Sequence, residues 1–500
     1  MSKQITMEEL ESYLWGSAVL LRTNVDAGAY KQYIFPLLFF KRICDVYDEE
    51  CEQILKEYDG DPEALTFEEN HSFMVPKGSH WKDVRAVSTD VGKALTKAFH
   101  EIEKANYEKL HGIFGDASWT NKNRLPDRLL KDLIEHFSSK TLSLANCPKD
   151  ELGQGYEYLI KKFADDSGHT AQEFYTNRTV VHLMTEMLEP QSGESIYDPT
   201  CGSAGMLISC IAYLKEHGRE WRNVSIYGQE IVTLTSAIGR MNLLLHGVQD
   251  FEIVNGDTLA SPAFTENGKL KTFDLILANP PYSISQWNRE AFASDKYGRN
   301  ILGVPPQGRA DYAFFQHILK SLDEETGRCA ILFPHGVLFR KEERDMRQKL
   351  VYGDYLECVI GLGPNLFYNS PMEACIVICR MSKRADQIGK VLFINALDEV
   401  ERKNAQSYLT DEHIKKIAEA YKRYQSVEGF AQIATIQDIE KNDFSLSIPL
   451  YVRTKHAEDE DNLTLQEHYD IWRGASERMH TYYSLLNDML QKGGDSNGQS

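Results

Sequence analysis

The chain has 500 residues and a net charge of −19, so it is too long for one ordinary domain and too acidic to hold nucleic acid through a generally basic surface. The nine cysteines are widely spaced and form no Cys-x-x-Cys pair, which argues against both a disulfide framework and a metal site. Residues 1–10 are polar, and no apolar run is long enough to span a bilayer. We therefore expect a cytoplasmic protein of two or three domains with no membrane segment.

Residues 1–160 have a helical pattern. In 30–58 the apolar residues recur near helical spacing, although Pro36 should kink this helix or mark its first turn. The region shows neither strand alternation nor a glycine-rich turn of catalytic kind. We interpret it as an N-terminal helical domain that accompanies the chemistry without carrying it.

Between residues 161 and 385, short apolar runs alternate with helical patterns. This alternation is typical of an α/β domain whose mostly parallel sheet is covered on both faces. Ligands of such sheets bind beyond the carboxyl ends of the strands, so the residues that follow each run are the candidates for a site. The expected strands are 194–198, 224–230, 251–255, 273–278, 329–334, 356–362 and 374–379.

The region 386–492 is expected to be mostly helical. Residues 411–425 place apolar side chains on one helical face, behind a capping Thr410 or Asp411. Apolar residues from 475 to 489 step by four and three, which predicts a long amphipathic helix. That helix either packs onto its own domain or docks a partner. Residues 493–500 are expected to be a disordered tail.

Three successive strands end in acidic residues. The first ends at Asp198 and continues into a turn of small residues, 199–205, where the backbone can approach a ligand closely. A carboxylate there suits an ammonium group. Glu230 at the second strand end suits ribose hydroxyls, and Asp257 at the third can accept from the exocyclic amine of an adenine ring. Each acid alone is more often a solvated cap, but three in succession indicate a binding site.

The sequence has neither of the common nucleotide-binding turns. A dinucleotide site would show Gly-x-Gly-x-x-Gly, and a phosphate loop would show Gly-Lys followed by Ser or Thr; both are absent. Without a phosphate loop, we expect neither ATPase nor nuclease activity from this chain.

The fourth strand opens directly into Asn279-Pro280-Pro281-Tyr282, the most specific signal in the chain. Two successive prolines hold the backbone extended and leave its carbonyls free. The Asn279 amide oxygen and the Pro280 carbonyl can both accept from one NH2 group, which favours the pyramidal form of an amine whose lone pair is otherwise delocalised into a ring. Tyr282 supplies a flat face for a base swung out of a helix. The pattern predicts methylation of an exocyclic amine, with an ordinary Asn-Pro turn as the alternative.

In their order, these motifs resemble those of the amino-methylating DNA methyltransferases, and more closely those of the modification subunits of type I restriction-modification systems. The resemblance extends to 14–42, 327–334, 363–368 and 444–449, and so covers nearly the whole chain. It implies a seven-stranded Rossmann-like methyltransferase sheet with an N-terminal helical domain and a C-terminal helical extension. It also implies S-adenosylmethionine as cofactor and N6 of adenine in DNA as the methyl acceptor.

The resemblance implies roles for individual residues. The ribose of the cofactor is expected against Glu230 and its adenine ring against Asp257. Phe367 is the candidate for a second aromatic wall beside the flipped base. The methionine end is expected to lie against Glu173, Phe174, Tyr175, Thr176, Asp198, Thr200, Gly202, Ser203 and Gly205.

Two positions depart from the family. Asn177 stands where proline is usual and should loosen the turn after Thr176, and Ala204 stands where glycine is usual and should slightly crowd the loop. Neither change removes a functional group, so activity is expected to survive both. The polar segment 283–308 is either a loop that orders over the flipped base or a mobile surface loop.

The acidic charge fits the resemblance, because a type I modification subunit does not select its own target. Recognition of the double-stranded DNA sequence is expected from a separate specificity subunit, with two modification subunits for each specificity subunit. The full complex is expected to add a restriction subunit. An acidic subunit that works beside a DNA-reading partner accounts for −19 better than a solitary enzyme does.

Three other functions remain as alternatives. A protein glutamine methyltransferase uses the same Asn-Pro-Pro-Tyr device on a side-chain amide, although such enzymes are generally shorter and lack the flanking regions. N4-methylation of cytosine uses a similar loop, usually with serine in place of Asn279. A non-catalytic scaffold keeps the fold while a partner does the work, and the intact Asn279 and Tyr282 argue against it.

Overall fold

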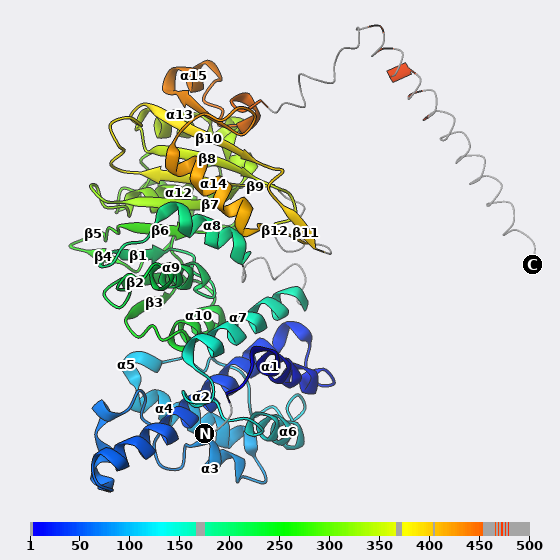
Figure 1. Ribbon diagram of the computed structural model, residues 1–500, viewed down its shortest axis with the longest axis vertical. Coiled ribbons are helices and arrows are strands. Elements are labelled where there is room, and N and C mark those ends of the chain that lie inside the picture. The colour runs from blue at the N-terminus through cyan, green and yellow to red at the C-terminus, as the bar shows by residue number, and fades with distance from the viewer. Residues whose placement is uncertain are drawn as a thin grey trace, which may run out of the picture.

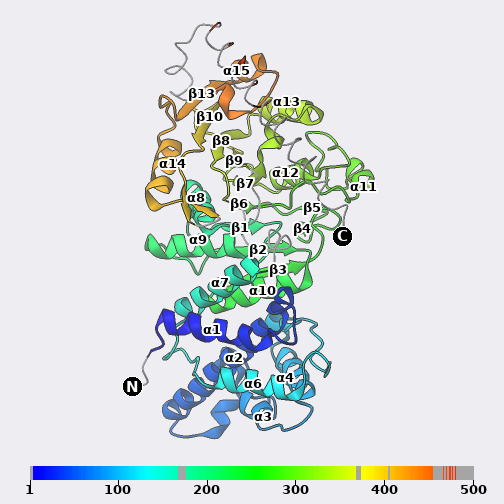
Figure 2. The same ribbon diagram turned by 90° about the vertical axis from the view of Figure 1, so that its right-hand side faces the viewer.

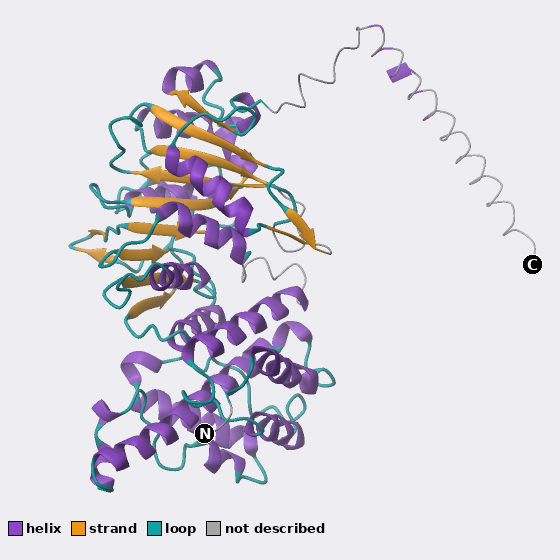
Figure 3. Ribbon diagram, viewed as in Figure 1, coloured by secondary structure: helices purple, strands orange, loops and turns teal. Residues whose placement is uncertain are grey.

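The computed structural model describes residues 4–166, 176–366, 373–403 and 406–453, together with positions 466, 469, 472, 473, 476 and 479. Helices fill one end of the molecule, and a large sheet with its covering helices fills the other (Figure 1, Figure 3). Within these residues no helix has the length and apolar character needed to cross a membrane. All nine cysteines are free thiols.

The N-terminal helices form a domain around an aromatic core. The longest helix, α2 (Lys31–Glu57), forms because its apolar residues recur at helical spacing, and it accommodates Pro36 in its second turn. Phe40 packs against Phe99 and Phe114, whose rings stack with their centroids 4.3 Å apart. The other helices are α1 (Met7–Leu21), α3 (Trp81–Arg85), α4 (Val91–Ala105), α5 (Tyr107–Leu110), α6 (Asp127–Ser138) and α7 (Lys149–Asp166).

The main sheet has nine strands in the order β13-β10-β8-β9-β7-β6-β1-β2-β3. Most neighbours are parallel, but β9 is antiparallel to both β7 and β8, and β13 is antiparallel to β10. All seven expected runs are strands of this sheet, so the predicted number was two too low. The seven are β1 (Ser195–Asp198), β2 (Ser225–Glu230), β3 (Phe251–Asn255), β6 (Leu275–Ala278), β7 (Arg328–Pro334), β8 (Leu356–Leu362) and β9 (Ala374–Arg380).

The two additional strands, β10 (Lys390–Ala396) and β13 (Ala431–Thr435), extend the sheet beyond β8. They lie in the region 386–492, which also contains α14 (Asp411–Arg423) and α15 (Ile436–Lys441). The amphipathic helix expected at 475–489 lies almost wholly outside the described residues. Two short hairpins complete the strands: β4 (Thr265–Glu266) with β5 (Lys269–Leu270), and β11 (Glu401–Lys403) with β12 (Gln406–Tyr408).

Helices cover both faces of the sheet, as the apolar strands require (Figure 2). Successive residues of β1 belong to different cores, one on each face of the sheet. Ile196 shares a core with residues of α8 (Arg178–Leu188), α9 (Gly205–Glu216) and α14, whereas Tyr197 shares one with residues of α12 (Asp311–Lys320) and α13 (Arg344–Tyr352). The helix α10 (Thr233–Leu245) follows β2, and the short α11 (Arg289–Ala293) lies between β6 and α12.

The helical domain packs against the sheet domain through α7 and α10. Buried residues of α10 belong to the same core as the N-terminal helices. Glu157 of α7 accepts hydrogen bonds from Arg178 at the start of α8 and from Asn242 of α10. Asn242 also donates to the carbonyl oxygen of Ser203 at 2.8 Å. The helical domain thus supports the turn that follows β1.

Candidate active site

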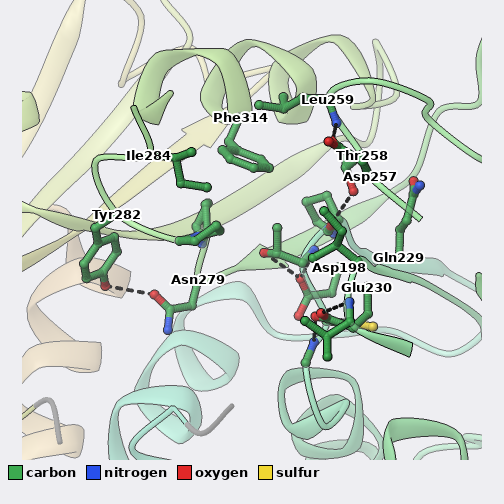
Figure 4. Close-up of a pocket in the computed structure, with 18 of the residues that line it drawn as sticks. Asp198, Gln229, Glu230, Asp257, Thr258, Leu259, Asn279, Tyr282, Ile284 and Phe314 are labelled. Atoms are coloured by element: carbon green, nitrogen blue, oxygen red, sulfur yellow. Dashed lines mark hydrogen bonds between the residues drawn. The ribbon is translucent and has the colours of Figure 1, made fainter. Parts of the chain in front are cut away.

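A cavity of about 470 Å³ opens at the carboxyl ends of β1, β2, β3 and β6, a volume suited to a small organic ligand. Asn279 and Tyr282 lie toward one end of it, and Asp198, Glu230 and Asp257 lie toward the other (Figure 4). Every expected site residue that the structure describes lines this cavity: Thr176, Asp198, Thr200, Gly202, Ser203, Gly205, Glu230, Asp257, Asn279, Pro280, Pro281 and Tyr282. The other four, Glu173, Phe174, Tyr175 and Phe367, lie outside the described residues.

The turn between β1 and α9 is tightly folded against its neighbours. Gly202 and Ala204 both have left-handed backbone conformations, with φ of 52° and 63°. A Cβ atom on Gly239 of α10 would lie 2.8 Å from the Gly202 carbonyl oxygen, so that helix can approach the turn only because it carries glycine there. The turn is therefore held in one shape by α10, which is the preorganisation that a binding loop needs.

Asp198 is a buried carboxylate at the floor of the cavity, with 2% of its surface exposed. Its Oδ1 atom accepts from the amide of Thr200 at 2.9 Å, and no described residue donates to its Oδ2 atom. Burial raises the pKa of Asp198 to about 7, the Thr200 bond opposes this shift, and the negative charge of Glu230 adds to it. A bound cation would stabilise the ionised form.

Glu230 joins two turns. Its Oε2 atom accepts from the amide of Gly202 at 3.0 Å, and its Oε1 atom accepts from the amide of Val232 at 2.8 Å. Asp257 closes its own turn, because its Oδ1 atom accepts from the amides of Leu259 and Ala260 at 2.8 and 3.0 Å. The two amides use both lone pairs of Asp257 Oδ1, and no described residue donates to its Oδ2 atom, which leaves that oxygen as an acceptor for a ligand.

The Asn279 side chain has a defined orientation. Its Nδ2 atom donates to the Thr176 hydroxyl at 3.0 Å, and its Oδ1 atom accepts from the Tyr282 hydroxyl at 2.8 Å. Burial raises the pKa of the Tyr282 hydroxyl well above its usual value, so the hydroxyl remains a donor. The amide oxygen, with its second lone pair, is thus available as an acceptor beside the Tyr282 ring, as the sequence pattern requires.

This fold and this set of residues agree with comparisons to known proteins. Residues 148–460 match the N-6 DNA Methylase family, and residues 10–137 match the HsdM N-terminal domain. The chain belongs to the N-6 DNA methylase family. The match covers more than half of the chain and includes the whole cavity.

The relatives are type I methylase subunits, the branch of the family to which the chain belongs. The MjaVIII methylase subunit of Methanocaldococcus jannaschii is 32% identical over 498 residues, covering 94% of this chain and 82% of that protein. The HindI methylase subunit of Haemophilus influenzae is 31% identical over 416 residues, covering 77% of this chain and 91% of that protein. Among solved structures, the chain is similar to the type I restriction-modification methyltransferase subunit from Streptococcus thermophilus. That crystal structure superposes with a TM-score of 0.78 at 30% identity, covering 90% of this chain and 100% of that one.

The structure shows the consequences of the two departures from the usual methylase motifs. The sequence had suggested that Asn177 loosens the turn after Thr176, and the structure shows that it does not. Its Oδ1 atom accepts from the Thr179 amide at 3.1 Å and caps α8, while its Nδ2 atom donates to the carbonyls of Leu366 and Ser407 at 3.1 and 3.0 Å. Ala204 is the costlier change, because a left-handed alanine is strained by roughly 1–2 kcal/mol.

An apolar wall of the cavity was not predicted from the sequence. Ile284, Trp287, Leu259 and Phe314 line the cavity and pack into one small cluster with buried Phe292 of α11. Ile231 and Val232 are 62% and 45% exposed beside Glu230, which is unusual for side chains of this size. Large apolar residues just after a polar strand end were the available signal in the sequence.

The segment 283–308 is hydrogen-bonded to the residues that follow Asp257 at the end of β3. Buried Arg299 donates to the carbonyls of Thr258 and Leu259 at 3.1 and 2.8 Å and pairs with Asp295 at 2.6 Å. Thr258 and Leu259 directly follow Asp257 and line the cavity. The segment therefore forms a side wall of the cavity, and whether it closes over a flipped base stays a prediction.

Proposed function

We propose that this methylase transfers a methyl group from S-adenosylmethionine to N6 of an adenine that has been flipped out of duplex DNA. One observation carries the proposal: a single cavity brings the acidic ends of three strands together with the Asn279-Pro280-Pro281-Tyr282 loop. The acids suit the cofactor, and the loop suits an exocyclic amine.

The residues fit the cofactor in chemistry. Buried Asp198, with an oxygen that receives no hydrogen bond from the described residues, suits the ammonium group. Glu230 and Asp257 suit the ribose hydroxyls and the adenine amine, and exposed Ile231 and Val232 offer an apolar surface for the ring. When bound, S-adenosylmethionine supplies an electrophilic methyl group on a sulfonium.

The chain's own part in the reaction is to bind and orient the target amine. Asn279 Oδ1 and the Pro280 carbonyl accept from the two hydrogens of the amine, which directs its lone pair out of conjugation. The Thr176 and Tyr282 hydroxyls hold the Asn279 amide so that its oxygen faces the base. Tyr282 supports the flipped ring by stacking. Asn279 cannot take up the proton, which leaves to solvent after the transfer.

The partners follow from the same family membership. We expect double-stranded DNA as substrate, a specificity subunit that selects the sequence with two copies of this chain per copy, and a restriction subunit in the full complex. The net charge of −19 supports this arrangement, because so acidic a chain must either confine its positive charge to one groove or rely on a partner to hold DNA. Nine free thiols fit a reducing cytoplasm.

The proposal is tested by identifying the methylated atom. The chain is co-purified with its specificity subunit, incubated with duplex DNA and S-adenosylmethionine carrying a labelled methyl group, and the DNA is digested to nucleosides. We expect the label in N6-methyl-2′-deoxyadenosine, and none when Asn279→Ala replaces the wild-type chain. Label in N4-methyl-2′-deoxycytidine, or on the glutamine of a release factor added to the same reaction and not on DNA, would overturn the proposal.

A further inference from the structure

The loop that holds the target base ends in a strained residue. Ser283, directly after Tyr282, has a left-handed backbone with φ of 53°. For a residue other than glycine this conformation costs roughly 1–2 kcal/mol, so surrounding contacts must hold it. The described contact is a hydrogen bond from the Ser283 amide to Oδ1 of Asp311 at 2.9 Å.

The Asp311 carboxylate connects three segments of the chain: α12, the residue that follows Tyr282, and the turn after β7. Asp311 is the first residue of α12 and only 1% exposed. Its Oδ2 atom pairs with Nη1 of Arg340 at 2.6 Å, and Arg340 comes from the turn that follows β7. The Arg340 guanidinium can lie in this position because residue 336 is glycine, where a Cβ atom would lie 2.5 Å from it. The carboxylate thus links the end of the Asn279–Tyr282 loop to α12 and to the turn after β7.

We propose that Asp311, held by Arg340, is the positioning residue that fixes Tyr282 and Asn279 for the target base. The inference rests on the proposed function of that loop. A buried ion pair adds little net stability compared with apolar packing, so placement of the loop accounts for this pair better than stability does. Asp311 touches neither the base nor the reacting atoms; it acts through the backbone of Ser283.

The connection from Asp311 to the chemistry is short. Ser283 follows Tyr282 in the chain, and the Tyr282 hydroxyl donates to Asn279 Oδ1, the acceptor for the target amine. If the Ser283 amide loses its acceptor, the left-handed residue can relax and carry Tyr282 with it. Misplacement of a reacting group by about 1 Å can reduce turnover about 100-fold. The cofactor acids are on other strands and should be unaffected.

The test compares the Asp311→Ala variant with the wild-type chain, each in complex with the specificity subunit. We expect kcat for DNA methylation to fall about 100-fold, while Kd for S-adenosylhomocysteine changes less than about twofold. With 2-aminopurine at the target position, the fluorescence rise that accompanies base flipping should be lost. The matched control is Glu357→Gln on β8. It breaks another buried carboxylate–arginine pair, the one that Glu357 forms with Arg380 of β9. It should lower Tm but keep kcat and the fluorescence rise.

A rescue variant separates placement from a structural role. Glycine adopts the left-handed conformation without strain, so Ser283→Gly combined with Asp311→Ala should recover part of the lost kcat and fluorescence rise. If Asp311→Ala does not fold, Asp311→Asn takes its place; it breaks the charge pair with Arg340 and should lower kcat with unchanged cofactor affinity.

Wild-type kcat and fluorescence in the folded Asp311 variant would overturn the inference, as would an equal loss of kcat, cofactor affinity and Tm with no rescue by glycine. Failure of the wild-type complex to produce N6-methyl-2′-deoxyadenosine in DNA would instead overturn the proposed function.

Discussion

If buried Asp198 holds the ammonium group of the cofactor, as proposed, cofactor binding should depend on pH. Its pKa in the free chain is about 7. The ammonium group of the cofactor favours the ionised carboxylate, so binding must displace the proton wherever Asp198 is protonated. If the pKa in the complex falls to the usual range for aspartate, affinity at pH 6 should be about tenfold lower than at pH 8. Affinity therefore falls with decreasing pH, and about half a proton is released at pH 7.

Titration calorimetry with S-adenosylhomocysteine at pH 6, 7 and 8, in buffers of different ionisation enthalpy, measures both quantities. Asp198→Asn should bind more weakly at pH 8 and lose the pH dependence. The control ligand is 5′-methylthioadenosine, which lacks the ammonium group and should bind with the same affinity at each pH. Equal affinity of the wild-type chain at pH 6 and 8 without proton release, or a pH dependence that persists in Asp198→Asn, would refute the role of this carboxylate.

Three further predictions concern other residues. Asn279→Ala should reduce methyl transfer by at least about 100-fold with nearly unchanged Kd for S-adenosylhomocysteine; retained turnover would contradict its role. Arg299→Met should raise the Kd for S-adenosylhomocysteine, because the carbonyls of Thr258 and Leu259 lose their donor. The control Lys296→Met, at an exposed position of the same segment, should leave this Kd unchanged. Equal Kd values for the two variants would contradict the anchoring role of Arg299. Burial raises the pKa of Glu343 to about 7, so ionisation destabilises the fold increasingly from about pH 5 to 8. Glu343→Gln should gain stability over wild type across that range, by up to about 3 kcal/mol; a pH-independent difference in Tm would contradict this.

The strands and the polar ends of the sheet could be predicted because their signals are local. Each apolar run is bounded by turn residues, and parallel strands bring their carboxyl ends to one edge, so Asp198, Glu230, Asp257 and Asn279 had to converge. The strand β10 was missed although it contains the apolar run Val391–Ile394, because the helical pattern that follows it dominated the interpretation of that region. The strand β13 is a short edge strand with weak alternation.

The contacts that hold the loops in place could not be predicted, because they join segments distant in sequence. Arg299 reaches carbonyls 40 and 41 residues earlier, and Asp311 meets Ser283 and Arg340 only after α12 and the turn after β7 have packed. Asn177 was misjudged for the same reason, since its amide group reaches the carbonyls of Leu366 and Ser407. Polar side chains that bond to backbone carbonyls leave no periodic pattern in the sequence.

The central claim is that Asn279 and Pro280 together hold the amine of a flipped adenine. A structure of the complex of this chain with its specificity subunit, target DNA and the non-reactive cofactor analogue sinefungin tests that claim most directly. We predict that the target adenine lies outside the helix on Tyr282, with its N6 atom within hydrogen-bonding distance of both Asn279 Oδ1 and the Pro280 carbonyl oxygen. A target base bound elsewhere, or one that leaves both acceptors without contact, would contradict the account.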